Sequence, residues 1–382
     1  MRNMVIIVCV LFVLSFFFLF DDNNDDKKNV DYYVEDRIIY FSYIEFSKYI
    51  TGLSDDIQKR NINEVLDNVK NLGFNRIIVH VRPFSDSIYE SKYYPISKYI
   101  LNDKGNVPSY DVLEYFIKES HKRGIKFDAW INPYRVSNLN DESLLTDYSS
   151  KTDSGIYLNP AKKEVQELIV NGIVEIVEKY DVDGIHFDDY FYPDKKIDLD
   201  DYKEYITNGG NLSIEEFRYN NVKSLIKKVY SSIKRVNKEV LFGIAPVGNI
   251  DNCYSESFLD VKYILSHEGY VDYIMPQVYY GFYNESRPFK DTVDYWNSLI
   301  KKDSIKLIPA LAIYKSGNVD KYAHSGKNEW IENTDIIKRE ILYSRSLSNY
   351  SGFSLFSFNY IFNDQYTNSN NIKEIENMKS IL

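Results

Sequence analysis

Eight short apolar runs alternate with amphipathic segments along this chain of 382 residues, and this repeated order most constrains its fold. The runs cover residues 37–46, 72–84, 123–135, 182–193, 239–248, 271–280, 305–314 and 352–360. Strands that are apolar on both faces and alternate with helices are typical of a parallel sheet covered by helices. Eight such units over about 345 residues predict a (β/α)8 TIM barrel, an α/β fold that spans residues 37–382 as one domain.

Helix signals separate the apolar runs. Apolar residues recur at helical spacing over 62–72, and Asn159-Pro160 has the pattern of an N-cap followed by a first helical proline. Ser213 and Glu216 have capping-box spacing ahead of another helix. An open, doubly wound sheet is the structural alternative, but no glycine-rich phosphate loop follows an early strand.

The N-terminus carries a separate targeting signal. Arg2 precedes an unbroken apolar run over 4–20, and a polar, acidic segment over 21–36 follows it. The run is at the short limit for crossing a bilayer, and no small-residue cleavage site follows it. Residues 1–20 are therefore predicted to be a signal anchor, with a cleaved signal peptide as the alternative, and 21–36 a polar linker. Both interpretations place the barrel outside the cytoplasm, either membrane-anchored at the cell surface or secreted.

Charge and cysteine content exclude several classes of protein. The formal net charge is −10, and no basic stripe offsets it, so nucleic acid is not an expected partner. A neutral or cationic ligand fits an acidic domain better. The chain has two cysteines, and Cys9 lies in the N-terminal apolar run, so disulfides do not hold the fold together.

Two adjacent carboxylates, Asp188 and Asp189, end the apolar run at 182–193. Strand alternation places His186 and Asp188 on one face and Phe187 on the other. If Phe187 packs against the helices, His186 and Asp188 face the barrel interior, and Asp189 lies at the rim. Two carboxylates at the end of a buried strand are costly to desolvate, which indicates a catalytic role. The structural alternative is that one aspartate caps the next segment and the other pairs with an arginine.

The ends of other strands supply amide, guanidinium, indole and phenol groups. The candidate substrate-binding residues are His80, Arg82, Asp86, Tyr89, Trp130, Asn132, Tyr134, Arg135, His186, Tyr190, Gln277, Tyr279 and Asn359. Such groups donate paired hydrogen bonds to hydroxyls and offer flat faces to a sugar ring. For any one of them a structural role is about as plausible, so the prediction of a sugar site depends on their convergence.

Metal and serine-hydrolase chemistry are weaker alternatives. His80, His186 and Asp188 could converge on a metal ion, but the chain has no H-x-H or H-E-x-x-H motif. It also has no G-x-S-x-G elbow for a nucleophilic serine. We therefore expect neither a metal nor another cofactor.

Several blocks of sequence resemble the glycosyl-hydrolase-like 10 family, a group of bacterial envelope proteins with a (β/α)8 fold. The blocks are VRPFSDSIYESKYYPIS (81–97), AWINPYRVS (129–137), YLNP (157–160), DGIHFDDYFYP (183–193), FGIAPVG (242–248) and PQVYYGF (276–282). They occur in the family's order and cover about residues 37–360, which makes the resemblance specific. A more distant similarity is to barrel hydrolases that cut partly deacetylated poly-N-acetylglucosamine.

The resemblance implies a glycoside hydrolase fold with Asp188 and Asp189 as the catalytic centre. It also implies a site lined by Arg82, Asp86, Asn132, Tyr134, Arg135 and Gln277. The chain departs from the family pattern at His80, where the family usually has Gln, and at Asp128, where it often has His. Both positions lie on neighbouring strands, so the substrate preference is expected to differ.

These features predict a lysozyme- or glucosaminidase-like hydrolase of an amino-sugar glycan in the bacterial envelope. The expected substrate is peptidoglycan, including its N-deacetylated form, or a polymer like poly-N-acetylglucosamine; an acidic domain suits a chain with free amines. Asp188 is expected to supply one catalytic carboxylate, and the second comes from Asp189, Asp86, Glu45 or Glu285. Alternatively, one aspartate polarises the substrate's acetamido group while the other donates the proton. A non-catalytic glycan-binding barrel and a metal-dependent hydrolase or deacetylase are the competing functions.

Overall fold

A curled parallel sheet forms the centre of the computed structural model, which describes residues 34–138, 146–189 and 191–382. It has nine strands in the order β10-β9-β8-β7-β3-β2-β1-β12-β11. The strands are β1 (Asp36–Phe41), β2 (Arg76–Arg82), β3 (Lys126–Ile131), β7 (Gly184–Phe187), β8 (Leu241–Ile244), β9 (Tyr273–Ile274), β10 (Lys306–Leu307), β11 (Ala310–Leu311) and β12 (Gly352–Leu355). Every neighbouring pair in this sheet is parallel, as the sequence predicts.

The two end strands of the sheet, β10 and β11, are separated in the chain only by Ile308 and Pro309. The N–H of Ile308 donates to the carbonyl of Ile274 at 3.0 Å, on the β9 side. The N–H of Ser354 donates to the carbonyl of Pro309 at 3.0 Å, on the β12 side. Proline has no N–H, so it interrupts the ladder without ending the extended path. Residues 306–311 therefore form hydrogen bonds with β9 on one side and with β12 on the other.

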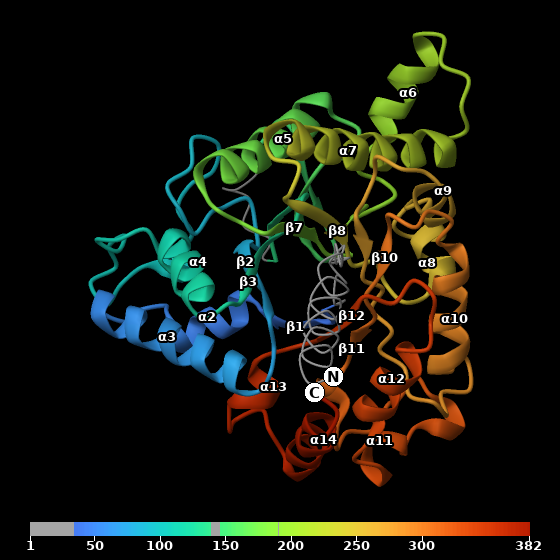
Figure 1. Cartoon of the computed structure of the whole chain (residues 1–382). Helices are drawn as coiled ribbons and strands as arrows, with labels where there is room; N and C mark the ends of the chain where they lie inside the picture. The colour runs from blue at the N-terminus through green and yellow to red at the C-terminus, as the bar shows by residue number, and fades with distance from the viewer. Residues whose placement is uncertain (1–33, 139–145, 190) are drawn as a thin grey trace, which may run out of the picture. The chain divides into compact units, whose positions relative to one another are not determined.

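Helices cover the outer face of the sheet (Figure 1). The longer ones are α3 (Asp55–Asn71), α4 (Val112–Lys122), α5 (Lys163–Lys179), α7 (Ile214–Val236), α10 (Phe289–Leu299), α12 (Ile336–Ser344) and α14 (Ser369–Lys379). Shorter ones are α2 (Tyr43–Tyr49), α6 (Leu199–Thr207), α8 (Ile250–Ser255), α9 (Val261–Ser266), α11 (Glu329–Glu332) and α13 (Asn359–Phe362), with 3-10 turns η1 (Lys98–Ile100), η3 (Ile313–Lys315) and η4 (His324–Gly326). The prediction of an α/β fold, with helices covering a parallel sheet, is confirmed.

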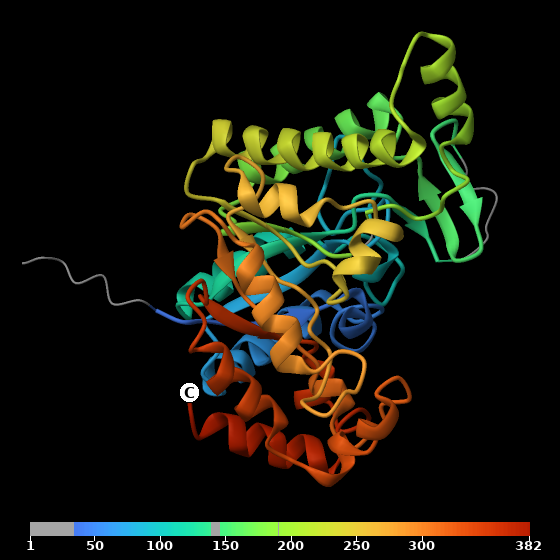
Figure 2. The same cartoon turned by 90° about the vertical axis from the view of Figure 1, so that its right-hand side faces the viewer.

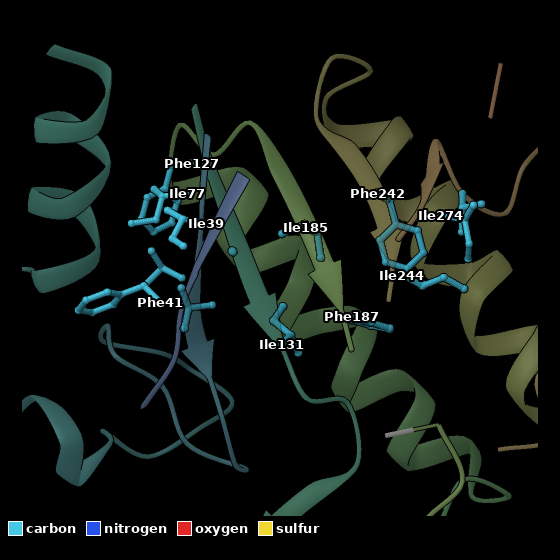
Figure 3. Packing of buried hydrophobic residues seen from close by; sticks show 14 of the residues in the cluster. Ile39, Phe41, Ile77, Phe127, Ile131, Ile185, Phe187, Phe242, Ile244 and Ile274 are labelled. Carbon is cyan, nitrogen blue, oxygen red and sulfur yellow. The ribbon is translucent and has the colours of Figure 1, made fainter. Parts of the chain in front are cut away.

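Alternate residues of the strands pack under these helices. Ile39, Ile77 and Phe127 lie side by side on the outer face of β1, β2 and β3, and Ile185 and Phe187 continue this layer on β7 (Figure 3). All five are fully buried. Burial of each such side chain contributes about 1.5–3 kcal/mol, which makes this layer the main source of stability.

The inner face of the sheet holds a second, smaller cluster. It contains Ile38, Tyr40, Ile78, Trp130, Ala245, Tyr273, Met275, Ile308 and Ala310. Two glycines make room for it, because a Cβ atom at Gly184 would lie 2.6 Å from Asp128 Oδ1, and one at Gly243 would lie 2.0 Å from the ring of Tyr273. The inner layer therefore accommodates large polar side chains that a uniformly aliphatic sheet would exclude.

A small antiparallel sheet lies beyond β3, where the sequence shows only a long polar segment. It is formed by β4 (Arg135–Ser137), β5 (Ser149–Thr152) and β6 (Gly155–Leu158) in the order β4-β6-β5. The small sheet and α6 lie on the same side of the large sheet, in green at the upper right of Figure 2. Asn159 Nδ2 joins them by donating to Asp201 Oδ2 at 2.8 Å.

The predicted signal segment, residues 1–20, lies outside the described residues, as does most of the predicted linker, 21–36. Residues Glu35–Leu382 form one compact unit. Across the described ranges, no helix combines the length and apolar character that a membrane span requires.

Candidate active site

A cavity of about 280 Å³ opens at the carboxyl ends of the parallel strands. Its lining is Tyr40, Ser42, Tyr43, Ile44, His80, Trp130, Arg135, Asp188, Asp189, Gln277, Tyr279, Tyr314 and Phe356. These residues belong to or directly follow β1, β2, β3, β7, β9, β11 and β12. The carboxyl ends of strands are where barrel enzymes build their sites, so this cavity is the candidate active site.

Seven residues singled out from sequence lie together in this lining. They are His80, Trp130, Arg135, Asp188, Asp189, Gln277 and Tyr279. Phe187 is buried on the outer face of β7. Because side chains alternate along a strand, His186 then points inward and Asp188 lies at the cavity.

Arg82 lies outside the lining, although it is only two residues from His80. The pairing of β2 with β3 shifts register between these residues, so that His80 pairs with Trp130 and Arg82 pairs with Ile131. Such a bulge turns the side chain to the opposite face. The guanidinium of Arg82 is instead 4.1 Å from the ring centroid of Tyr94, on the outer side of the sheet.

Other residues predicted to bind substrate also lie outside the lining. They are Asp86, Tyr89, Asn132, Tyr134, His186 and Asn359. Asn132 donates from Nδ2 to the carbonyl of Pro83 at 3.0 Å, and Asp86 accepts from the N–H of Phe84 at 3.1 Å. Both contacts are made with the loop after β2 and help to order it. Tyr190, the remaining predicted contact, is outside the described residues.

The candidates for a second carboxylate fall into different places. Glu45 is fully buried and accepts from the N–H of Ser42 at 2.8 Å and from Ser357 Oγ at 2.6 Å. Glu285 accepts from Ser325 Oγ at 2.9 Å. Of the candidates named from sequence, Asp189 alone shares the lining with Asp188.

The surroundings of Asp189 favour its protonated form. Asp188 is 5% exposed. Burial raises the pKa of Asp189, while a hydrogen bond from Gln277 and the positive charge of Arg135 oppose the rise. A carboxyl with a raised pKa keeps its proton closer to neutral pH, which suits a general acid.

His80 and Trp130 form one wall of the cavity. Their rings are stacked, with centroids 3.7 Å apart and planes 4° apart. Burial and the nearby positive charge of Arg135 hold the pKa of His80 well below its usual value, so the imidazole is neutral. Neither ring nitrogen of His80, nor Nε1 of Trp130, has a hydrogen-bond partner of good geometry among the described residues. Both rings thus combine a flat apolar face with ring nitrogens that are able to form hydrogen bonds.

A chain of buried polar side chains runs beneath the cavity. Arg76 Nη1 donates to Asp128 Oδ1 at 2.6 Å, and the hydroxyl of Tyr273 donates to Asp128 Oδ2 at 3.3 Å. His186 Nδ1 lies 3.0 Å from the Tyr273 hydroxyl, and His186 Nε2 lies 2.8 Å from the hydroxyl of Tyr40. The chain connects the buried cation of Arg76 to Tyr40, which lines the cavity.

The direction of these hydrogen bonds follows from the Asp128 carboxylate, which only accepts. Because Tyr273 donates its proton to Asp128, its oxygen accepts from Nδ1–H of His186. Nε2 of His186 is then an acceptor for the hydroxyl of Tyr40. Burial lowers the pKa of His186 to about 3, so the ring is neutral and carries one proton. Tyr40 therefore directs its proton inward to His186, and Met275 Sδ lies 3.0 Å from the same hydroxyl oxygen.

Several lining residues were not singled out from sequence, namely Tyr40, Ser42, Tyr43, Ile44, Tyr314 and Phe356. The sequence does contain a signal for the turn that carries residues 42–44, because Ser42 and Glu45 have capping-box spacing. They form that capping box at the start of α2. The box ends β1 at residue 41 and turns the following side chains over the cavity.

No group of three or more His, Cys, Asp or Glu side chains in the described ranges is arranged to hold a metal ion. His80 and His186, the two histidines of the possible metal site, have different partners. His80 stacks on Trp130, and His186 is held between Tyr40 and Tyr273.

Comparison with known proteins places this geometry in context. The family model described as Glycosyl hydrolase-like 10 matches residues 28–326. Glycosyl hydrolase YngK of Bacillus subtilis (strain 168) is 32% identical over 335 residues, which cover 80% of this chain and 64% of YngK. Glycosyl hydrolase DigH of Escherichia coli O6:H1 is 30% identical over 343 residues, which cover 80% of this chain and 76% of DigH. The chain thus spans slightly less than two thirds of YngK.

Among solved structures, the PgaB (BpsB) glycoside hydrolase domain from Bordetella bronchiseptica has a similar fold. The TM-score is 0.55 at 12% sequence identity, and the match covers 85% of this chain and 94% of that domain. At this identity the likeness concerns the fold alone.

Proposed function

Because the chain belongs to the glycosyl hydrolase-like 10 family, we propose that it is a glycoside hydrolase that cleaves an amino-sugar glycan of the bacterial envelope, with peptidoglycan as its substrate. The observation that carries this proposal is the position of Asp188 and Asp189, side by side in one aromatic-walled cavity. Trp130, Tyr279 and Phe356 offer flat faces to a sugar ring, and the aspartates lie where its glycosidic bond would be held.

Asp189 is the proposed general acid. Its raised pKa keeps the carboxyl protonated closer to neutral pH than an exposed aspartate, so it is suited to protonate the glycosidic oxygen as the C1–O bond breaks. Asp188 is the proposed second carboxylate, which would stabilise the positive charge that develops at C1. With an N-acetylated sugar, Asp188 would instead orient the acetamido oxygen that attacks C1, and water would then open the resulting ring.

The proposed fold is a (β/α)8 barrel over residues 37–382, in which β10 and β11 are one interrupted strand. Ile308 donates to Ile274 of β9, and Ser354 of β12 donates to Pro309, and these two hydrogen bonds support the closure. Residues 1–20 are proposed to direct the barrel out of the cytoplasm as a signal anchor, since an apolar run follows Arg2 there.

Mass spectrometry of reaction products tests the proposed activity. The purified protein would be incubated with native peptidoglycan and with peptidoglycan that has been chemically N-acetylated, with Asp188→Asn and Asp189→Asn as controls. We expect new reducing ends that are lost in both variants, and the better substrate would distinguish recognition of free amines from recognition of acetamides. Full activity in both variants, or no products from either sample, would contradict the proposal; tight binding without products would favour a glycan-binding barrel.

A further inference from the structure

A second cavity, of about 610 Å³, adjoins the candidate active site. The two share Tyr314, which follows β11. The lining of the second cavity is Tyr314, Lys315, Asn318, Val319, Asp320, Lys321, Tyr322, Tyr360, Gln365, Tyr366 and Asn368. Four of these side chains are tyrosines: Tyr314 and Tyr360 are half-buried, and Tyr322 and Tyr366 are exposed.

The tyrosines form a continuous path outward from the active-site cavity. The rings of Tyr279 and Tyr314 have centroids 5.7 Å apart, and those of Tyr314 and Tyr360 are 5.8 Å apart. The path continues from Tyr360 to Tyr366 at 5.5 Å. Exposure increases along it, since Tyr279 is half-buried and Tyr366 is 41% exposed. Aromatic rings gathered on a surface expose apolar area to water, which is typical of a binding surface.

The loop beneath this path is held in place by hydrogen bonds. Lys315 Nζ donates to the carbonyl of Tyr279 at 2.7 Å and pairs with Asp320 Oδ2 at 2.7 Å. On the other side, Asn368 Nδ2 donates to the carbonyl of Ser316 at 2.9 Å. The rings are therefore presented by a fixed loop, which lowers the entropy that ligand binding would cost.

We propose that Tyr314, Tyr360 and Tyr366 form an outer subsite, which binds sugars of the glycan chain beyond those held in the active-site cavity. This inference rests on the proposed glycoside hydrolase function and extends its site, so that several sugars of a long strand are bound at once. Rings that continue from the cavity suit a chain of pyranoses, because each sugar presents a flat C–H face to an aromatic ring. Gln365 and Lys321 lie in the same lining and offer hydrogen-bond donors to the sugar hydroxyls.

The test uses the full-length protein and glycan strands prepared from peptidoglycan and fractionated by length. Tyr366→Ala removes the outermost ring, Tyr366→Phe retains it, and Tyr295→Ala removes a ring of similar exposure on α10, since Tyr295 is 46% exposed. We expect Tyr366→Ala to lower kcat/KM by about threefold to tenfold on long strands, the effect of losing one ring contact. The shortest cleaved strand would be unaffected, and both other variants would resemble the wild type.

An equal effect of Tyr366→Ala on long and short strands, or no effect on either, would overturn the subsite while leaving the hydrolase proposal intact. If the wild type cleaves no strand, the hydrolase proposal fails, and binding of the same strands then decides the question of the subsite. Weaker binding of long strands by Tyr366→Ala than by Tyr295→Ala would support the subsite. Equal binding by these two variants, or no binding at all, would overturn it.

Discussion

The imidazole of His80 lies flat against the indole of Trp130, with ring centroids 3.7 Å apart. It extends the aromatic wall of the cavity by one ring, and burial keeps that ring neutral. The wall therefore gains apolar area without adding a charge near the aspartates.

His80→Gln tests what the stacked ring contributes. The variant keeps a polar side chain but loses the flat face, which we expect to raise KM by about twofold to tenfold, the worth of one aromatic contact. Because His80 is already neutral, kcat and the pH optimum should stay close to those of the wild type. Steady-state kinetics on the glycan at several pH values would measure this, with His121→Gln on α4 as a control. A displaced pH optimum would contradict the neutral state of His80.

Asp189→Asn is expected to abolish activity and yet stabilise the fold at neutral pH. The folded-state pKa of Asp189 is raised, so ionisation costs more in the folded than in the unfolded chain. That cost is absent below the unfolded value of about 3.9 and grows as pH rises through the folded-state pKa. Thermal unfolding at neutral pH should give a higher Tm for Asp189→Asn than for the wild type, and the difference should vanish in acid.

An exposed residue provides the control for this stability measurement. Asp303 precedes β10 and is exposed, so Asp303→Asn should change Tm by little at any pH. A lower Tm for Asp189→Asn at neutral pH would show that contacts of the charged carboxylate outweigh the cost of its burial.

The tautomer of His186 can be observed directly. Its contacts with Tyr273 and Tyr40 require a neutral ring with the proton on Nδ1, and burial lowers its pKa to about 3. Nitrogen-15 NMR of histidine-labelled protein should show this tautomer unchanged from neutral pH down to about pH 5, well above that pKa. His267 is exposed at the surface and serves as a reference resonance. Signals of an Nε2–H tautomer or of an imidazolium would contradict the inferred direction of the hydrogen bonds.

Asp128→Asn is expected to be strongly destabilising. Asp128 is fully buried and pairs with Arg76, which is 2% exposed, so the substitution leaves a buried cation short of a partner. Breaking a buried pair in this way costs about 3–5 kcal/mol. Chemical denaturation would measure the loss in the free energy of unfolding. Arg76 also contacts Asp36, which is part-exposed, and Asp36→Asn should therefore cost less.

The sequence was sufficient to predict the strands of the large sheet and to point to seven of the residues that line the cavity, because side chains alternate along a strand and the carboxyl ends of parallel strands meet at one edge. It was insufficient where the backbone departs from a straight strand. The bulge between His80 and Arg82 turns Arg82 outward, and nothing in the composition of β2 marks that bulge. At Ser42 the chain turns into α2, and there the capping box could have revealed the turn.

The outer tyrosines were harder to predict for a different reason. Tyr314 follows β11, whereas Tyr360 and Tyr366 follow β12, and their contacts depend on how these two loops fold back towards each other. The chain contains 35 tyrosines, so residue type alone does not distinguish these three. Hydrogen bonds of the loop, such as that from Asn368 to Ser316, decide which rings meet.

β1 is paired on one side with β2 and on the other with β12, where Arg37 lies opposite Phe353. During synthesis, β1 therefore has only one neighbour until residues 352–355 have left the ribosome. Through that interval its unpaired edge can join other chains, and pairing so distant in sequence is slow to form. A chain cut short before β12 would lose a strand and would also leave one edge of β1 unpaired and β11 without its neighbouring strand. Such a product would be a substrate for chaperones or proteases instead of a smaller working enzyme.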